Sequence, residues 1–348
     1  MRRESRRIYC GDVPIGGGSQ VTVQSMTNTD TRDVEATVSQ IKAMEAEGCD
    51  IVRLAVLDMD AARAIGEIKK SVSIPLIADI HFDYRLAIES VESGVDGLRI
   101  NPGNIGGRDR VEKVVEVCRE RNIPIRIGVN SGSIRQDILD RFGGVNEDSL
   151  VYSAMEHVKI LEELDYRNIK LSLKTTDVDL TFRAYKKIAK MVDYPLHLGI
   201  TEAGTVWAGT IKSAVGIGAM LLEGIGDTLR VSLTGDPVEE IRVGKQILRT
   251  VGLLKDRIEI VSCPTCGRTQ IDLIKLANEV EKRISHIEKP IKLAIMGCVV
   301  NGPGEAKEAD IGIAGGKGEG LIFKKGKIVK KVREEDLLEE LIKEIENM

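Results

Sequence analysis

Between about residues 21 and 253, short apolar runs alternate with stretches of helical periodicity. Near-continuous apolar runs are typical of parallel strands that are covered on both faces. Eight such runs, rich in Val, Ile and Leu, are predicted to be strands: Val21–Met26, Ile51–Leu57, Pro75–Ile80, Gly97–Ile100, Pro124–Val129, Ile169–Leu173, Pro195–Ile200 and Thr228–Leu233. Between them, stretches such as Arg108–Arg121 place their apolar residues on one helical stripe.

Eight strand–helix units predict an α/β fold of the (β/α)₈ barrel type. A doubly wound open sheet has the same alternation and is the alternative. No Gly-x-Gly-x-x-Gly motif follows the first predicted strand, which weakens that alternative. We therefore predict a barrel.

After Leu253 the rhythm changes to an α+β pattern. Strands are expected at 257–261 and 291–296, with a helix between them at 271–284. A meander at 310–323 and a closing amphipathic helix at 334–346 follow. These patterns predict two domains, a barrel over residues 1–253 and a small domain over 254–348.

Composition narrows the classes of function. The net charge is −4, and aromatic residues make up 3% of the 348 residues. Both features argue against nucleic-acid binding, which needs a basic face and stacking aromatics. No apolar run approaches the about 18 residues of a membrane span, and the first residues lead into no hydrophobic signal region. We therefore expect no nucleic-acid or membrane partner and a cytoplasmic location.

Cationic side chains lie within or just after five of the predicted strands: Arg53, Arg99, Arg126, Lys174 and Arg230. In a barrel, the carboxyl ends of the strands carry the chemistry. Nearby carboxylates at this rim, mainly Asp58, Asp79 and Glu202, are too few to neutralise five cations. A phosphate or diphosphate ligand is therefore expected. The turn at 130–133, which begins at Asn130, could add backbone amide donors to it. The alternative is that each cation is an interior ion-pair partner.

Glu202, after the seventh strand, is a candidate acid or base at the mouth. Its alternative role is to orient Arg230 or Arg126. His81 and His197 are candidate donors in the pocket or structural groups, and their roles stay open. His157 lies on a predicted helix and is assigned no function.

Three of the six cysteines form a constellation. Cys263 and Cys266 form a Cys-x-x-Cys pair after one predicted strand, and Cys298 follows another. A structural zinc site normally needs a fourth ligand, often from a second pair, and none exists here. An iron–sulfur cubane with three thiolates fits this spacing best, and Glu305, in the Gly/Pro-rich loop after Cys298, is a candidate fourth ligand. The remaining Cys49 and Cys118 are expected in the core, and the segment around Cys10 is not placed.

Four segments resemble the 4-hydroxy-3-methylbut-2-en-1-yl diphosphate synthase family, the iron–sulfur enzymes of the methylerythritol phosphate route to isoprenoids. They are Cys-Pro-Thr-Cys-Gly-Arg-Thr at 263–269, Met-Gly-Cys-Val-Val-Asn-Gly-Pro-Gly-Glu at 296–305, Val-Gln-Ser-Met-Thr-Asn-Thr-Asp-Thr at 23–31, and Arg-Ile-Asn-Pro-Gly-Asn-Ile-Gly at 99–106. The resemblance covers essentially the whole chain. It implies the short bacterial form, a TIM barrel followed by a [4Fe–4S] domain similar to modules of sulfite and nitrite reductases.

The resemblance also implies roles for individual residues. Cluster ligands would be Cys263, Cys266, Cys298 and Glu305, and diphosphate contacts would come from Arg53, Arg99, Arg126, Lys174 and Arg230, with Asn130 nearby. Glu202, and Glu305 at the cluster, would be the catalytic carboxylates. The substrate would be 2-C-methyl-D-erythritol 2,4-cyclodiphosphate, whose ring opens with uptake of two electrons and loss of water. Electrons would come from reduced flavodoxin or ferredoxin, and a homodimer would share its active sites between chains.

The sequence leaves two alternative functions open. One is a zinc-stabilised barrel enzyme, such as an aldolase or a pterin-type synthase, that acts on a phosphate ester. The other is a cluster-bearing electron carrier without catalytic activity.

Overall fold

The computed structural model describes residues 2–298 and 306–348. The chain divides into two compact units, residues 1–254 and residues 255–348. Each unit has its own hydrophobic core, so the two are described separately below.

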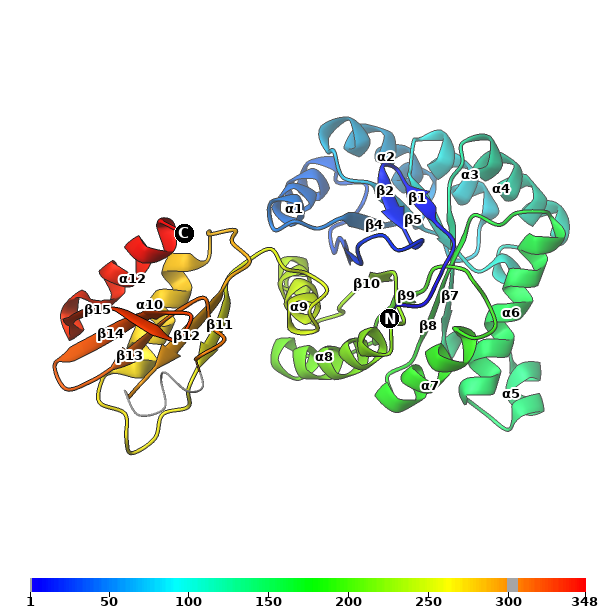
Figure 1. The fold of residues 1–348 in the computed structure, drawn as a ribbon. Helices are drawn as coiled ribbons and strands as arrows, with labels where there is room; N and C mark the ends of the chain where they lie inside the picture. The colour runs from blue at the N-terminus through cyan, green and yellow to red at the C-terminus, as the bar shows by residue number, and fades with distance from the viewer. Residues whose placement is uncertain (1, 299–305) are drawn as a thin grey trace. The chain divides into compact units, whose positions relative to one another are not determined.

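The first unit is built around an eight-stranded parallel sheet (Figure 1). Its order is β8-β7-β6-β5-β4-β3-β10-β9, and the Leu171 N–H donates to the Pro195 carbonyl at 2.9 Å to close β8 onto the segment before β9. The predicted barrel is thereby confirmed. The strands are β3 (Thr22–Met26), β4 (Ile51–Ala55), β5 (Leu76–Asp79), β6 (Gly97–Ile100), β7 (Ile125–Asn130), β8 (Ile169–Lys174), β9 (His197–Leu198) and β10 (Thr228–Leu229).

Helices cover the outside of this barrel. They are α1 (Val34–Ala46), α2 (Met59–Ser71), α3 (Tyr84–Glu92), α4 (Arg108–Glu120), α5 (Gln136–Phe142), α6 (Glu147–Glu163), α7 (Val178–Ile188), α8 (Val206–Leu222) and α9 (Pro237–Thr250). Five of them begin at an aspartate whose side chain accepts a backbone N–H of the first turn: Asp33, Asp58, Asp83, Asp177 and Asp236. Such caps satisfy donors that a helix start leaves unpaired, so each fixes where the loop after a strand ends.

The strands alternate between an apolar outer face and a polar inner face. On β7, Ile125, Ile127 and Val129 belong to the hydrophobic core. Arg126 and Gly128 occupy the alternating positions and point inward, where Gly128 lies against the Arg99 side chain. The barrel interior is therefore polar near the strand ends, although each strand is apolar overall.

An N-terminal hairpin, β1 (Ile8–Cys10) and β2 (Val13–Ile15), packs against the amino-terminal parts of β4 and β5. Ile8, Cys10 and Ile15 form a small cluster there with Ile51 and Ile77. This hairpin places Cys10 in a buried position, which the sequence pattern did not predict.

The second unit contains a five-stranded mixed sheet in the order β11-β12-β13-β14-β15. Its strands are β11 (Glu259–Ser262), β12 (Lys292–Met296), β13 (Ile311–Gly315), β14 (Glu319–Lys324) and β15 (Lys327–Arg333), and its helices are α10 (Leu273–Ile284) and α12 (Leu337–Glu346). β11, β12 and β13 run parallel, whereas β14 and β15 form antiparallel pairs. Both helices contribute to the core of this unit through residues such as Leu273 and Leu341. In the described part of the chain, no helix is long and apolar enough to cross a membrane.

Candidate functional site

The barrel interior contains the five cationic side chains that the sequence predicted at the strand ends. Arg53 lies on β4, Arg99 on β6, Arg126 on β7 and Lys174 on β8, and Arg230 directly follows β10. Arg99 and Arg126 are register partners on neighbouring strands, and both are buried, as is Lys174. The structure therefore brings together the cations that the sequence placed at the strand ends.

Among the described residues, two carboxylates form ion pairs with members of this set. Asp79, at the end of β5, lies 3.5 Å from Arg53 Nε and 3.2 Å from Arg99 Nη1. Glu240, from the first turn of α9, accepts from Arg230 Nε at 3.1 Å and Nη2 at 3.2 Å. Two carboxylates leave an excess of positive charge in a largely buried space, which an anionic ligand would offset.

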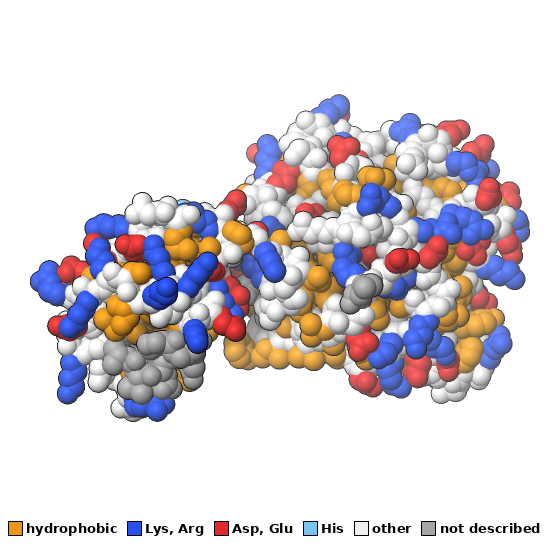
Figure 2. Space-filling model, in the orientation of Figure 1, with side chains coloured by type: hydrophobic (Ala, Val, Ile, Leu, Met, Phe, Trp, Pro, Cys, Tyr) orange, Lys and Arg blue, Asp and Glu red, His pale blue; other side chains and the backbone are white. Residues whose placement is uncertain are grey.

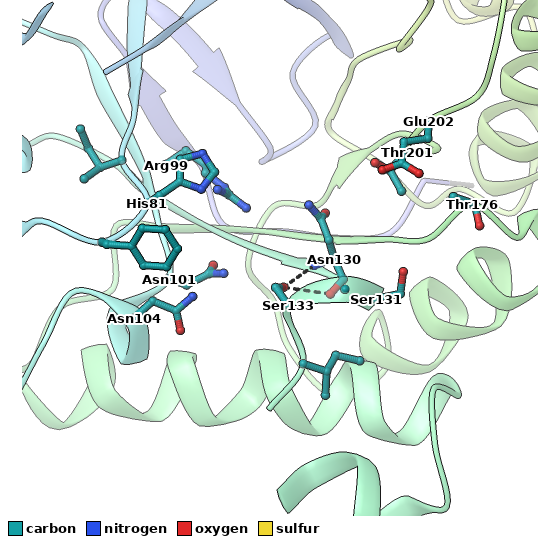
Figure 3. Close-up of a pocket in the computed structure, with 14 residues that line it drawn as sticks. His81, Arg99, Asn101, Asn104, Asn130, Ser131, Ser133, Thr176, Thr201 and Glu202 are labelled. Carbon is teal, nitrogen blue, oxygen red and sulfur yellow. Dashed lines mark hydrogen bonds between the residues drawn. The ribbon is translucent and has the colours of Figure 1, made fainter. Parts of the chain in front are cut away.

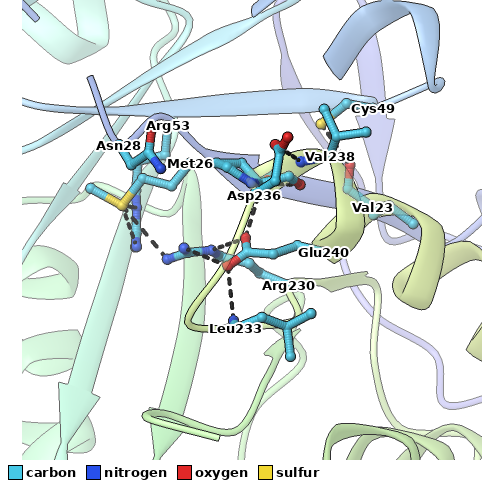
Figure 4. Close-up of polar contacts among 12 residues, drawn as sticks. Val23, Met26, Asn28, Cys49, Arg53, Arg230, Leu233, Asp236, Val238 and Glu240 are labelled. Atoms are coloured by element: carbon cyan, nitrogen blue, oxygen red, sulfur yellow. Dashed lines mark hydrogen bonds and ion pairs between the residues drawn. The ribbon is translucent and has the colours of Figure 1, made fainter. Parts of the chain in front are cut away.

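Glu240 is a site residue that sequence reasoning missed. It is buried, and besides Arg230 it accepts from the Ser25 hydroxyl. It also accepts from the Leu233 N–H (Figure 4). Its position in the first turn of the helix that follows Arg230 is the feature of the sequence from which the contact could have been predicted. Of the carboxylates proposed from sequence, Asp58 instead caps α2 and pairs with Arg32.

Several guanidinium groups are only weakly satisfied by the protein. The sulfur of Met26 lies 3.1 Å from Arg53 Nε and 3.6 Å from Arg230 Nη1 (Figure 4), and a thioether is a weak acceptor. Arg126 Nη1 donates to Ser172 Oγ at 3.2 Å, while its Nε and Nη2 have no partner among the described residues. Unused donors in a buried position indicate room for ligand oxygens or water.

Burial and repulsion between neighbouring cations both shift the pKa values of these groups. Burial lowers the pKa of Arg53 to about 10, an effect that Asp79 opposes. Burial, followed by the charges of Arg53 and Arg99, lowers the pKa of Arg126 well below its usual value. Burial alone would raise the pKa of Asp79, but the surrounding positive charges, of which Arg53 and Arg99 are the largest, together outweigh it and the net shift is downward. The carboxylate therefore stays ionised between the two guanidinium groups.

Two interior glycines give the cationic side chains space. A methyl group on Gly128 would lie 2.7 Å from Arg99 Nε, and one on Gly199 would lie 2.6 Å from Lys174 Nζ. Both distances are shorter than any tolerated contact, so a larger residue would displace the cation. These glycines are also site residues that the sequence alone did not identify.

A pocket of about 710 Å³ opens beside this cluster (Figure 3). Its lining residues come from Arg99 of β6, from Asn130 at the end of β7, and from the loops that follow β5, β6, β7, β8 and β9. The full set is Ile80, His81, Phe82, Arg99, Asn101, Asn104, Asn130, Ser131, Gly132, Ser133, Ile134, Thr176, Thr201 and Glu202. The Ser133 hydroxyl accepts the Asn130 N–H at 3.0 Å and donates to the Asn130 carbonyl at 2.8 Å. This brace fixes the turn from which the Asn130 side chain extends into the pocket (Figure 3).

Glu202 and His81 line opposite sides of the pocket (Figure 3). Glu202 is exposed and has a φ of 50°, a left-handed conformation that costs energy for a non-glycine residue. Within the described residues, it forms no ion pair with Arg230 or Arg126, whose contacts are given above. His81 Nε2 lies 3.9 Å from Asp79 Oδ1, and its side chain is largely exposed.

His157, to which the sequence assigned no function, supports one turn of the pocket. Its Nδ1 accepts the Gly103 N–H at 3.1 Å, between the lining residues Asn101 and Asn104. Burial, then the charge of Arg135, lowers the pKa of His157 to about 4. The neutral imidazole needed for this hydrogen bond therefore persists at physiological pH.

The second unit holds the thiol segment, defined here as Cys263, Cys266 and Cys298. Register pairing of Ser262 with Ile295 places the ends of β11 and β12 side by side, and Cys263 and Cys298 follow these ends. The Gly297 N–H donates to Cys263 Sγ at 3.3 Å. Hydrogen bonds from Arg268 lower the pKa of Cys266, which is exposed.

These residues fit an iron–sulfur cluster in their chemistry. Thiolates are the ligands that such clusters use, and N–H donors to the sulfur atoms are part of how proteins tune them. Over residues 2–298 and 306–348, no group of three or more His, Cys, Asp or Glu side chains lies in a metal-binding arrangement. Glu305, the expected fourth ligand, lies outside the described residues.

The other three cysteines are buried thiols of the barrel unit. Burial raises the pKa of Cys10, Cys49 and Cys118 to about 12 in each case. They are therefore protonated core residues, as expected for Cys49 and Cys118.

Two family models match the chain. The first, described as the GcpE TIM-barrel domain, matches residues 5–245. The second, described as the GcpE protein C-terminal domain, matches residues 259–347. Together they cover nearly all of both units.

Full-length relatives are similar to the chain from end to end. A protein of Caldanaerobacter subterraneus subsp. tengcongensis is 65% identical over 348 residues, which are 100% of this chain and 98% of the relative. A protein of Clostridium perfringens is 64% identical over 347 residues, with coverages of 100% and 99%. Both are named 4-hydroxy-3-methylbut-2-en-1-yl diphosphate synthase (flavodoxin).

Solved structures with a similar fold are more distant. A dihydropteroate synthase of Stenotrophomonas maltophilia has a TM-score of 0.53 at 11% identity and covers 72% of this chain and 100% of its own. The dihydropteroate synthase of Yersinia pestis has a TM-score of 0.51 at 10% identity, with coverages of 70% and 98%. At this level of identity the likeness concerns the barrel fold alone.

Proposed function

The chain belongs to the GcpE family, and we propose that it converts 2-C-methyl-D-erythritol 2,4-cyclodiphosphate to 4-hydroxy-3-methylbut-2-enyl diphosphate. Enzymes of this kind are oxidoreductases of isoprenoid precursor synthesis. The observation that carries the proposal for this chain is the excess of buried positive charge at the barrel mouth. A cyclic diphosphate supplies the negative charge that this arrangement lacks.

The diphosphate contacts are assigned to Arg53, Arg99, Arg126, Lys174 and Arg230. The unpartnered Nε and Nη2 of Arg126 support this assignment, because guanidinium groups bind phosphate oxygens through two donors at once. The fixed turn at Asn130 supports a contact of its amide with the same ligand.

Glu202 is proposed to lie close to the reacting carbons. It lines the pocket beside the cations, and its left-handed backbone holds it at the rim. Loss of a hydroxyl as water requires a proton at the departing oxygen, and a carboxylic acid is a suitable carrier of that proton. Its side chain would then hold or move one proton at this position.

Cys263, Cys266, Cys298 and Glu305 are proposed to hold a [4Fe–4S] cluster. Bound there, the cluster supplies the two electrons of the reaction one at a time. The names of the relatives favour reduced flavodoxin as the electron donor, with ferredoxin as the alternative. Glu305→Ala leaves three thiolates, so we expect a smaller loss of iron than for a cysteine variant, together with a severe loss of turnover.

A homodimer with shared active sites completes the proposal. α8 supports it, because Trp207, Ile211, Val215 and Leu222 are exposed on this helix, and Figure 2 shows hydrophobic side chains gathered over it. Lys212 is the only ionisable residue of α8. An apolar face of this kind on the barrel is suited to contact with a second copy of itself.

Complementation tests the sharing of sites. A Glu202→Gln chain and a Cys298→Ser chain, each inactive alone, are mixed under conditions of subunit exchange. A heterodimer pairs one intact barrel with one intact thiol segment, so activity returns. Zero activity after confirmed exchange would show that each chain builds its own site.

The reaction itself is tested by anaerobic turnover. The purified full chain, loaded with iron and sulfide, is incubated with the cyclic diphosphate and reduced flavodoxin, and the product is identified by mass spectrometry. Formation of 4-hydroxy-3-methylbut-2-enyl diphosphate with an iron-dependent electron paramagnetic resonance signal is the expected result. A colourless zinc protein without turnover would instead favour the zinc-stabilised barrel enzyme.

A further inference from the structure

A hydrogen-bonded row of three buried side chains crosses strands β8, β9 and β10. Lys174 Nζ lies 3.3 Å from His197 Nε2, and His197 Nδ1 lies 2.7 Å from Thr228 Oγ1. His197 and Thr228 are fully buried, and Lys174 is 7% exposed. The imidazole of His197 is therefore the hydrogen-bond partner that the described residues provide for the Lys174 amine.

This lysine has no carboxylate to balance it. Asp79 is shared by Arg53 and Arg99, and Glu240 is engaged by Arg230. In the part of the chain that the structure describes, no Asp or Glu lies within ion-pair distance of Lys174 Nζ. Lys174 is thus an amine without a local counter-charge.

The charged and titratable groups around Lys174 come from every neighbouring strand. Arg53, Arg99, Arg126 and Arg230 act on it from β4, β6, β7 and the end of β10. His197 lies on β9, and the Tyr185 hydroxyl of α7 is bound to the His197 carbonyl. Lys170, four residues earlier on β8, is buried, and its Nζ has no described partner. Glu202 lies at the pocket rim.

Among these cations, the ammonium group is the one that gives up a proton. Guanidinium groups remain charged in proteins, whereas buried lysines lose their charge readily. Burial, followed by the charges of Arg126, Arg53, Arg230 and Arg99, lowers the pKa of Lys174 well below its usual value. Burial also lowers the pKa of Lys170, to about 8, so this second lysine must be distinguished experimentally.

We propose that binding of the cyclic diphosphate is coupled to uptake of one proton from solvent by Lys174, and that His197 is the positioning residue that holds this amine toward the ligand. The inference rests on the proposed function and adds a proton linkage to the same site. In the bound state the ammonium donates to His197 Nε2. The imidazole then carries its proton on Nδ1 and donates it to Thr228 Oγ1.

The neutral imidazole needed for this arrangement is favoured by its surroundings. Burial, then the charge of Lys174, lowers the pKa of His197 well below its usual value. Gly199 leaves the space that Lys174 Nζ occupies. Because binding takes up a proton, affinity falls as pH rises above the free-state pKa of Lys174, by up to about tenfold per pH unit.

Isothermal titration calorimetry measures this linkage directly. The cyclic diphosphate is titrated into the oxidised, cluster-loaded full chain at about pH 8, midway between the ordinary histidine and lysine values, in two buffers of different ionisation enthalpy. Without a reductant no turnover occurs, so the buffer dependence of the heat gives the number of protons exchanged. We expect net proton uptake on binding.

Three variants assign the proton. Lys174→Arg keeps a cation that does not titrate, so uptake should vanish and affinity should depend less on pH. Lys170→Met should keep the uptake of the parent. His197→Phe should raise KM more than it lowers kcat and shift the pH profile of affinity, whereas His197→Gln, which retains an acceptor, should restore much of the affinity.

The outcomes separate the two levels of the argument. Absence of any binding would contradict the proposed function and the linkage together. Binding with no proton exchange would contradict the linkage alone. Proton uptake that is retained in Lys174→Arg but lost in Lys170→Met would show that Lys170 takes up the proton, and would overturn the inference. A His197→Phe chain that loses thermal stability but keeps the parent pH profile would show that His197 is only structural.

Discussion

The barrel mouth and the thiol segment differ in what holds their functional side chains. At the mouth, Arg99 donates both to Asp79 and to the Gly128 carbonyl, and Arg230 donates twice to Glu240. In the thiol segment, Cys266 is exposed and its N–H bonds to Thr269, while Cys263 accepts the Gly297 N–H. The side chains of the mouth are held by ion pairs with buried carboxylates, whereas Cys266 of the thiol segment lies at the surface.

Because of this difference, variants of the two regions should have distinguishable effects on substrate binding and on iron content. Variants at the mouth remove contacts to an anion that the fold already prepares, so they should weaken binding and leave the iron content alone. Variants in the thiol segment remove ligands, so they should lose iron while the mouth stays intact.

The largest expected effect is that of a thiol variant. Replacement of Cys263, Cys266 or Cys298 by Ser should lose most of the iron and all measurable turnover, because thiolates are the soft ligands that an iron–sulfur cluster requires. Iron and sulfide analysis with a turnover assay measures both. Cys118→Ala, at a buried thiol of α4, is the matched control and should keep iron and turnover. Full iron content in any one of the Ser variants would remove that residue from the ligand set.

A smaller but still large effect is expected at the arginines. Arg53→Met, Arg99→Met, Arg126→Met or Arg230→Met should each lower kcat/KM about tenfold or more, since a charge-assisted hydrogen bond is worth about 1.5–3 kcal/mol. For Arg126, thermal stability should be unchanged or higher, because its guanidinium is buried with two unpartnered nitrogens. Arg242→Met, on the surface of α9, should leave kcat/KM unchanged. An unfolded Arg126→Met chain with normal kinetics in its folded fraction would mean that this arginine is structural.

The smallest effect concerns the space that the cations need. Gly128→Ala puts a methyl group 2.7 Å from Arg99 Nε, so the guanidinium must move and KM should rise severalfold, about 1 kcal/mol. Gly66→Ala, on α2, has its nearest neighbour at 3.7 Å and serves as the control. Equal kinetics for both variants would show that the position of Arg99 does not matter for the substrate.

The fold was readable from sequence because strand and helix periodicities differ. β6 was predicted at its observed bounds, Gly97–Ile100, whereas β9 and β10 comprise two residues each instead of the six predicted. Their flanking residues still follow the barrel wall, as the bond from the Arg230 N–H to the Leu198 carbonyl shows. Apolar runs indicate a buried strand but not how many of its residues keep regular pairing.

The cations were also readable, because a charged residue inside an apolar run is unusual. The residues that contact these cations could not be predicted from the sequence. Glu240 reaches Arg230 from a helix, and Gly128 and Gly199 matter only through the side chains that cross them. The contact between Lys174 and His197 depends on the relative positions of β8 and β9, which one sequence does not provide.

The central claim is that the mouth binds the diphosphate independently of the thiol segment. Calorimetric titration of the cyclic diphosphate into full-length Cys298→Ser and Arg126→Met tests it most directly. We predict that Cys298→Ser, which lacks turnover, binds within about threefold of the parent, because the cations that contact the diphosphate are unchanged. Arg126→Met, with its iron intact, should bind about tenfold or more weakly. Loss of binding in Cys298→Ser, or parent-like binding in Arg126→Met, would contradict the account.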